Sequence, residues 1–397
     1  MNSPTLNTHL TGAGLAAFLT GLGLRLSRRL ARRLGPLRAA QSLGRYLLRE
    51  SSLFSAMPRR LVRHRGHIWA VPDLPPLDTD AFLDCLEREV SCAAGHSRPR
   101  PVTAIISLTG RCPHHCAYCY VDAALREAPE PSVDLLADTI TELVGLGVYT
   151  FHLSGGEPAL RSGDVLTLLG RVRRSGLRFW MLSTGTGLDF ERLSALARAG
   201  LSGVMISLDS HDLVHVNRLK GRDDAFNTAV AAMRDARRAG LLVAVNAVIG
   251  RPLLGEAAFL RFMETVGGLG ASFVNCYAPR RQSAPLPPEL KPFSIAEYRL
   301  LDRLTRRCNA SGAGLPLAFT PDLWEAVRGC QGGAGFLYID PAGQVRRCPF
   351  LSRSYGNIRD GSLALMLDRM QADPDREVCE GNRILTEALA TRKRRLR

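Results

Sequence analysis

The hydrophobic residues in the middle of the chain, between positions 100 and 280, fall into two alternating patterns. Short runs of apolar and β-branched residues predict six buried strands, at residues 102–108, 148–153, 177–182, 203–208, 241–249 and 271–277. Between them, apolar residues recur every three or four positions, which predicts helices at residues 132–146, 164–175, 190–199, 225–239 and 256–267. Strands that alternate with helices indicate βαβ units, a parallel sheet and right-handed crossovers.

Three cysteines lie within eight residues after the first predicted strand. Cys112, Cys116 and Cys119 form a C-x₃-C-x₂-C loop, a spacing that can wrap three thiolates around one iron–sulfur cube. Four-iron clusters usually take four cysteines, so three would leave one iron without a protein ligand. An open coordination position is typical of catalytic metal sites, because a small molecule can bind there. The other interpretation, unrelated or disulfide-bonded cysteines, has no support from a secretory signal.

The second predicted strand ends in the segment Ser-Gly-Gly-Glu-Pro. Gly155, Gly156 and Pro158 at a strand's carboxyl end would let the backbone approach a ligand closely. Glu157 offers an acceptor for an ammonium group. Taken alone, such a segment is more often an ordinary turn than a binding site.

The cysteine loop and the Gly-Gly-Glu-Pro segment together resemble the radical S-adenosylmethionine (SAM) superfamily, over residues 100–280. The resemblance implies an α/β fold, a partial (β/α)₆ TIM-like barrel whose ligands gather at the strand carboxyl ends. It also implies that SAM chelates the open iron of a [4Fe-4S] cluster, with its amino group held by the Gly-Gly-Glu segment. The residues that it associates with SAM are Tyr118, Gly155, Gly156, Glu157, Pro158, Ser183, Thr184, Ser207, Asp209 and Arg218.

Two of these segments leave alternatives open. The family commonly has Thr-Asn-Gly after the third strand, and Gly185 stands where asparagine is usual, which leaves the ribose contact open. Ser207, Asp209 and Arg218 would bear on the SAM carboxylate and ribose. The alternative is that serine or aspartate at a strand end merely caps the following helix.

A second cysteine pattern lies near the carboxyl terminus. Cys330 and Cys348 flank a predicted hairpin, strands 336–339 and 344–346 around Asp-Pro-Ala-Gly, which would bring the two thiols together. With the segment 355–363, the pattern resembles the SPASM/twitch auxiliary-cluster domains of many radical SAM enzymes. Only Cys379 follows, so the resemblance implies one auxiliary cluster at most, with no evident fourth ligand. A hairpin without any cluster is the alternative.

Charge is concentrated at the two ends of the chain. The net charge is +15, of which residues 1–65 carry +11 and residues 392–397 carry +5. On a helix, seven leucines between Leu15 and Leu37 fall on one arc beside an arc of arginines. This pattern favours attachment to an anionic membrane surface. A helix packed on the barrel is the alternative, and nucleic acid is a weaker one because aromatic residues are few.

The resemblance implies an enzyme that takes one electron from a reductant such as flavodoxin or ferredoxin. It would cleave SAM to methionine and a 5′-deoxyadenosyl radical, which takes a hydrogen atom from the substrate. The amphipathic segment favours a lipid or membrane-associated substrate, whereas the SPASM/twitch resemblance favours a ribosomal peptide or a cofactor precursor. A non-catalytic iron–sulfur electron carrier is the second alternative, but it would have no use for an ammonium-binding segment.

The expected organisation has three regions. A basic, amphipathic-helical region covers residues 1–98, the radical SAM core residues 99–300, and the auxiliary domain with its basic tail residues 301–397. Cysteine-ligated clusters and the lack of an export signal lead us to expect the cytoplasm, at the inner membrane face if the ends tether the protein.

Overall fold

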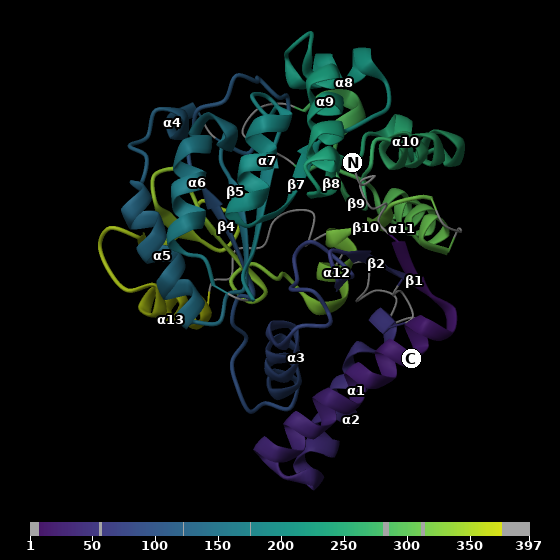
Figure 1. Ribbon diagram of the computed structural model, residues 1–397, viewed down its shortest axis with the longest axis vertical. Coiled ribbons are helices and arrows are strands. Elements are labelled where there is room, and N and C mark those ends of the chain that lie inside the picture. The colour runs from purple at the N-terminus through teal and green to yellow at the C-terminus, as the bar shows by residue number, and fades with distance from the viewer. Residues whose placement is uncertain are drawn as a thin grey trace.

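The computed structural model describes residues 8–54, 58–121, 123–174, 176–280, 286–310 and 314–374. Its centre is a ten-stranded sheet surrounded by helices (Figure 1), with the order β10-β9-β8-β7-β6-β5-β4-β11-β12-β13. The six predicted strands are all present, shifted by a few residues at most: β4 (Thr103–Ser107), β5 (Thr150–Ser154), β6 (Arg178–Ser183), β7 (Leu201–Ser207), β8 (Leu242–Val248) and β9 (Phe273–Tyr277). They pair in parallel and in sequence order, which confirms the α/β prediction of a partial TIM-like barrel.

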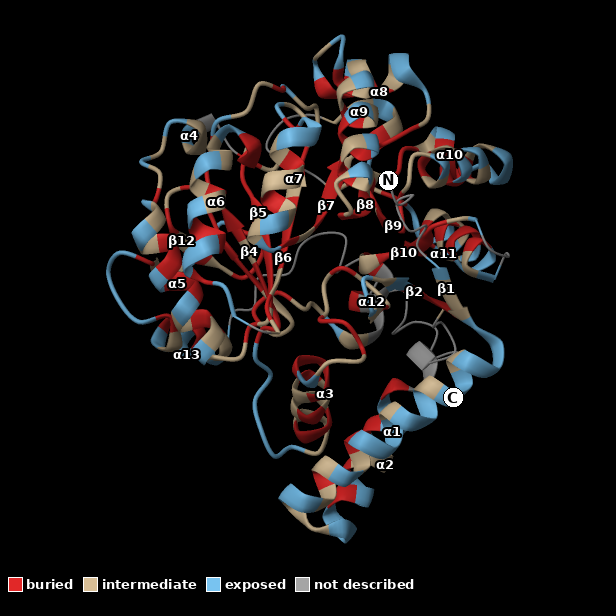
Figure 2. Ribbon diagram, in the orientation of Figure 1, coloured by how far each residue is buried: buried red, intermediate tan, exposed pale blue. Residues whose placement is uncertain are grey.

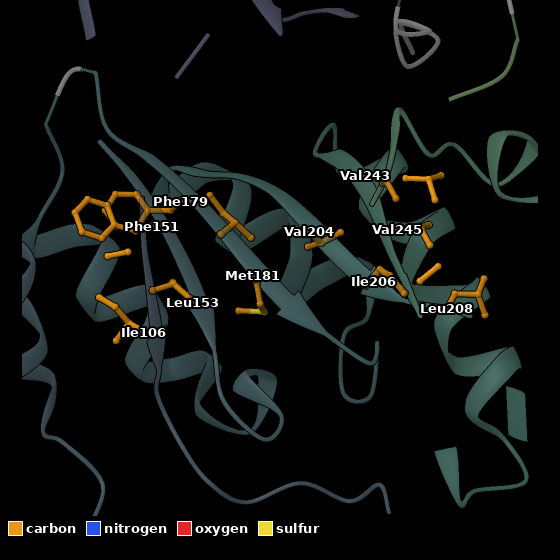
Figure 3. Packing of buried hydrophobic residues seen from close by; sticks show 14 of the residues in the cluster. Ile106, Phe151, Leu153, Phe179, Met181, Val204, Ile206, Leu208, Val243 and Val245 are labelled. Carbon is orange, nitrogen blue, oxygen red and sulfur yellow. The ribbon is translucent and has the colours of Figure 1, made fainter. Parts of the chain in front are cut away.

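The five predicted helices are confirmed as well and cover the outside of the barrel. They are α5 (Val133–Gly145), α6 (Ser162–Arg171), α7 (Phe190–Ala199), α9 (Ala225–Arg238) and α10 (Glu256–Gly268). Apolar side chains on the strands' outer face form the main core against these helices (Figure 3). Phe151 and Phe179 stack there with ring centroids 5.2 Å apart. The strands and the inner faces of the helices are accordingly the buried parts of the chain (Figure 2).

Two further parallel strands extend the barrel beyond the six predicted. β10 (Leu317–Phe319) pairs with β9, and β11 (Phe336–Ile339) pairs with β4. β11 and β12 (Gln344–Arg346) form the hairpin that the sequence predicts, and β13 (Ser354–Asn357) continues it. The sheet thus runs across the boundary expected near residue 300, and the division into domains stays a prediction.

The remaining elements connect and cover the barrel. They are the helices α4 (Ala123–Arg126), α8 (Leu213–Lys220), α11 (Ile295–Ala310), α12 (Pro321–Arg328) and α13 (Leu363–Ala372), and the 3₁₀ turns η1 (Pro158–Arg161), η2 (Arg251–Leu254) and η3 (Pro288–Leu290). Across the described parts of the chain, every helix is too short or too polar to cross a membrane.

The N-terminal region is a small sheet with three helices. β1 (Thr8–Thr11), β2 (Arg60–His64) and β3 (His67–Trp69) form an antiparallel sheet, and α1 (Gly12–Leu34) and α2 (Pro36–Phe54) lie beside α3 (Asp80–Ala93) (Figure 1). Leu26 and Leu30 on α1 are buried in a cluster with Leu83 and Val90 of α3. The leucine arc is therefore packed on the protein in this part, whereas Leu37, at 72% exposure, is not covered.

The same region closes the amino-terminal end of the barrel. Val62 of β2 and Trp69 of β3 belong to a buried cluster with Trp180, Phe273 and other residues from the strands' beginnings. The rings of Trp69 and Trp180 meet edge to face at 5.8 Å. The N-terminal sheet therefore fills the base of the barrel with apolar side chains.

Candidate functional site

The cysteine loop lies at the carboxyl ends of the strands, and backbone hydrogen bonds hold it on two sides. On the β5 side, the amides of Gly156 and Glu157 donate to the carbonyls of Thr109 and Arg111, at 2.7 and 2.8 Å. On the α8 side, the amides of His115 and Ala117 donate to the carbonyls of Lys220 and Leu219, at 3.1 and 2.9 Å. The loop that carries the three thiols is thus clamped between the end of β5 and the end of α8.

The two glycines of the Gly-Gly-Glu segment are required by this clamp. Gly155 has φ +143°, and a Cβ there would lie 2.4 Å from the carbonyl oxygen of Thr109. A Cβ on Gly156 would lie 2.2 Å from the carbonyl oxygen of Arg111. The close backbone approach that the sequence predicts is therefore made first to the cysteine loop itself, which leaves no room for any side chain.

The three thiols form a donor set that fits an iron–sulfur cube better than a single ion. Burial, together with the neighbouring Cys119, raises the pKa of Cys112 and raises that of Cys116 to about 11. No three His, Cys, Asp or Glu side chains of the described residues are arranged around one metal ion. In a cubane each thiolate binds a different iron, so the sulfurs need not converge on one point.

The Glu157 carboxylate is fully buried and already saturated with internal donors. One oxygen accepts hydrogen bonds from the Ser183 hydroxyl at 2.7 Å and from the Ala159 amide at 3.0 Å. The other accepts from the amide and hydroxyl of Thr184, at 2.8 and 2.5 Å. Burial raises the pKa of Glu157, and these four donors oppose that shift. Glu157 therefore ties β5 to β6, and its carboxylate has little capacity left for an ammonium group.

The backbone of the same segment does offer acceptors. Within the described residues, the carbonyl oxygens of Gly155 and Gly156 accept no hydrogen bond. Carbonyl oxygens with free lone pairs are suitable partners for an ammonium group. The acceptors that remain in this segment are therefore main-chain oxygens.

A buried polar network joins the cysteine loop to the ends of β7 and α8. The Lys220 ammonium, 2% exposed, lies 3.0 Å from a carboxylate oxygen of Asp209 and donates to the hydroxyls of Tyr118 and Ser207. The Tyr118 hydroxyl in turn donates to Asp209. Burial acts to lower the pKa of Lys220, but the charge of Asp209 outweighs it and the pKa is raised. Three of the predicted residues thus meet around a lysine that the sequence reasoning missed.

Arg218 does not join this network. Its side chain is 55% exposed and pairs with Glu289. Lys220, two residues further along α8, is the basic residue that faces the cysteine loop. One signal could have pointed to it, because Lys220 is one of three lysines in a chain with 52 Lys and Arg residues.

The departure at Gly185 has a packing reason. Gly185 has φ +95°, and a Cβ there would lie 2.9 Å from the Cβ of Ala232 and 3.0 Å from the carbonyl of Thr228, both on α9. An asparagine would be strained at this φ and would collide with α9. The adjacent Thr186 instead hydrogen-bonds His114 of the cysteine loop at 2.8 Å.

The C-terminal hairpin reaches the same end of the barrel. Tyr120, next to Cys119, meets Tyr338 and Phe350 edge to face, at 6.1 and 6.0 Å. Burial is the main cause that raises the pKa of Cys348 to about 12. Arg280 acts to lower this pKa, whereas Glu325 and Cys330 act to raise it. The hairpin therefore brings Cys330 into electrostatic range of Cys348, as its turn predicts. Cys379 lies outside the described residues.

Comparisons with known proteins agree with this geometry. Residues 106–264 match the family model described as the Radical SAM superfamily. The PqqA peptide cyclases of Streptomyces rochei and Ruegeria pomeroyi are 31% and 32% identical over 260 and 263 residues. These matches cover 63% of this chain and 69% and 68% of the two relatives.

Solved structures share the fold at lower identity. Streptococcus suis SuiB bound to precursor peptide SuiA superimposes with a TM-score of 0.57 at 14% identity, covering 86% of this chain and 79% of that one. The structure of anSMEcpe with bound AdoMet has a TM-score of 0.53 at 15% identity, covering 72% of this chain and 83% of that one.

Proposed function

Because this chain belongs to the radical SAM superfamily, we propose that it cleaves SAM reductively at a [4Fe-4S] cluster on Cys112, Cys116 and Cys119 and modifies a ribosomally made peptide. Enzymes of this superfamily use SAM, a four-iron cluster and an external reductant, for which flavodoxin or ferredoxin is our proposal. When bound, the cluster and SAM supply the electron transfer and the radical. The chain's own residues bind, orient and shield them. Membership of an enzyme family removes the electron-carrier alternative.

The clamped cysteine loop is the observation that carries the proposal. A three-thiol loop alone could fold in many ways, but here the Gly-Gly-Glu backbone and the end of α8 fix it from two sides. The loop is presented at the carboxyl ends of the strands, where parallel α/β barrels place their ligands. Cluster-binding thiols, an ammonium acceptor and a buried cation are thereby gathered at one end of the barrel.

We assign the polar groups of SAM to the partners that this end provides. Lys220 matches the carboxylate by charge, because it is the buried ammonium beside the cysteine loop. Its three N–H groups already bind Asp209, Tyr118 and Ser207, so the carboxylate would replace one of these partners. The free carbonyls of Gly155 and Gly156 match the amino group. Asp209, Ser207 and Tyr118 hold Lys220 in place and remain candidates for the ribose hydroxyls.

The peptide substrate is supported by the relatives rather than by the site. The two relatives above, which match this chain over 260 and 263 residues, are named for a peptide. The lipid alternative depends on the leucine arc of α1, and there Leu26 and Leu30 are buried against α3. We therefore prefer the peptide to a membrane-resident substrate.

The cofactor proposal is tested by removing the thiols. The triple variant Cys112→Ala, Cys116→Ala, Cys119→Ala should lose about four irons and all 5′-deoxyadenosine formation under dithionite. Cys92→Ala, which removes a half-buried thiol on α3, is the matched control and should keep both. A reconstituted triple variant that still forms 5′-deoxyadenosine would refute the proposal.

The peptide part has a separate test. The reconstituted enzyme is incubated with SAM, dithionite and the short peptide encoded nearest its gene, and the peptide is weighed by mass spectrometry. We expect a covalent mass change that depends on SAM. SAM cleavage without any change in the mass of the peptide would leave the cofactor proposal intact and refute the proposed peptide substrate.

We also propose one auxiliary cluster on Cys330, Cys348 and Cys379. The first support is that burial and the neighbouring Cys330 both raise the pKa of Cys348, so the two thiols are within electrostatic range. The second is that Phe350, two residues after Cys348, packs against Tyr120 of the cysteine loop. The wild-type protein should then carry about eight irons in two cubanes. A value near four that is unchanged in Cys348→Ala would show that the hairpin keeps the family's shape without its metal.

A further inference from the structure

Below the cysteine loop, the barrel interior holds a buried histidine opposite a carboxylate. His152 on β5 is 3% exposed, and its Nε2 atom has no hydrogen-bond partner among the described residues. That nitrogen lies 3.8 Å from a carboxylate oxygen of Asp73. The separation is too long for a hydrogen bond but short enough for one donor to bridge the two atoms.

The N-terminal region supplies Asp73 to the barrel. The segment between β3 and α3 lies beside the start of β4, where the hydroxyl of Thr103 donates to the Asp73 carbonyl at 2.6 Å. The Asp73 side chain is 51% exposed, and among the described residues its one ionic neighbour is His152. The carboxylate therefore remains accessible to a ligand.

Both facing atoms are acceptors. The His152 ring hydrogen-bonds to the backbone of Pro72, and because proline has no N–H the ring must donate. Since Nε2 has no partner, the donor is Nδ1–H, and Nε2 of the neutral ring then carries a lone pair. Burial lowers the pKa of His152, which favours the neutral ring. The buried Nε2 atom and the exposed Asp73 carboxylate are thus two facing acceptors that would be satisfied by an N–H donor.

The strand that carries His152 also contacts the cysteine loop. Ser154, two residues after His152 and on the same face of β5, is hydrogen-bonded to Tyr120 of the cysteine loop at 3.1 Å. Tyr277 at the end of β9 is within electrostatic range of both Asp73 and Tyr120, since burial and the charges of these two groups raise its pKa. The Tyr277 side chain is half-buried.

We propose that Asp73, His152 and Tyr277 line the substrate chamber and select a substrate with a cationic nitrogen, the ammonium or guanidinium of a basic peptide side chain. The peptide class rests on the proposed function, whereas the preference for a cation rests on these three side chains. Asp73 supplies the charge, and His152 and Tyr277 supply oriented polar contacts above the apolar base. The N-terminal region thereby determines specificity in a chamber otherwise built by the barrel.

The test measures binding without turnover. Protein reconstituted with its cluster and SAM is titrated with N-acetyl-lysine methylamide and with N-acetyl-norleucine methylamide, which has the same shape without the ammonium. We expect the lysine probe to bind at least about tenfold tighter, a difference of about 1.4 kcal/mol. Asp73→Asn should remove this preference. Asp134→Asn, on an exposed aspartate of α5 paired with Arg171, should retain it.

Each outcome decides for or against the chamber. Equal binding of the two probes to the wild-type protein would overturn the proposal, as would a lysine preference that survives in Asp73→Asn. A preference lost equally in Asp134→Asn would place the cation site elsewhere. SAM binding is measured in every variant, so that failure of the cofactor site is seen separately from failure of the cation site.

Discussion

At the carboxyl ends of its strands the barrel carries a polar loop, whereas at their amino ends it is closed by apolar side chains. The cysteine loop is held by four backbone hydrogen bonds and by the buried Lys220–Asp209 pair. The base is held by Val62 and Trp69, packed against Trp180 and Phe273. The polar end depends on directional hydrogen bonds and a charge pair, and the apolar end depends on the volume of its packed side chains.

This difference predicts which substitutions the protein tolerates at each end of the barrel. A buried charge must keep its partner, because an uncompensated charge in a low-dielectric interior is costly. An apolar cluster loses stability in proportion to the volume removed and keeps its arrangement otherwise. Substitutions at the polar end should therefore remove function outright, while substitutions at the base should first lower stability.

The largest effect is expected for Lys220→Met. The variant leaves Asp209 buried without its cation, which should cost about 3–5 kcal/mol of unfolding free energy and abolish SAM binding. Chemical denaturation and SAM titration of the reconstituted protein measure the two effects. Arg218→Gln on the same helix should change stability by about 1 kcal/mol or less, because its pair with Glu289 is exposed. If Arg218→Gln were the more damaging variant, the assignment of Lys220 would fail.

Trp69→Ala tests the apolar end. Removal of a nearly buried tryptophan should lower the unfolding free energy by about 3–5 kcal/mol. The cysteine loop should still take up iron at temperatures where the variant is folded. Leu48→Ala, at an 80% exposed position on α2, is the control and should stay within about 0.5 kcal/mol of the wild type. Loss of the loop's iron in a folded Trp69→Ala protein would show that the two ends are not independent.

Substitutions in the leucine arc of α1 distinguish packing on the protein from attachment to a membrane. Leu22→Ser with Leu26→Ser should lower the unfolding free energy by roughly 2–5 kcal/mol, since Leu26 is buried beside α3. Binding to anionic liposomes, measured by co-sedimentation, should not change. Leu24→Ser, on an exposed position of the same helix, should leave stability nearly unaltered. Reduced liposome binding at unchanged stability would restore the membrane interpretation.

The smallest effect concerns pH. Burial and the neighbouring Arg65 lower the pKa of His64 on β2 from 6.5 to about 4, so the folded state prefers the neutral ring. Its contribution to stability is present above pH 6.5 and is lost as the pH falls towards 4. Between pH 7 and pH 4.5, His64→Gln should therefore lose roughly 1–3 kcal/mol less than the wild type.

His114 at the polar end also has its pKa lowered to about 4 by burial and by Lys220. The contribution of His64 is therefore measured as the difference between the stability curves of His64→Gln and the wild type, because the wild-type curve alone also contains His114. Parallel pH curves for His64→Gln and wild type would contradict the shift.

The sequence by itself determined the barrel and the location of its chemistry. The six strands and five helices follow from local periodicity, and the cysteine loop and Gly-Gly-Glu segment follow the strands that carry them. These features depend on residues close together in the chain, since a strand or helix must bury one face wherever it lies. The hairpin of β11 and β12 was predictable for the same reason, from its Pro and Gly turn.

Only the tertiary structure decided what covers each face and which side chains meet. A leucine arc requires a cover but does not specify it, and here α3 provides that cover. Lys220 and Arg218 differ by two positions on one helix, and only the packing of α8 against the cysteine loop separates the buried cation from the exposed one. Asp73 reaches His152 across 79 residues of chain, a proximity that no local pattern records.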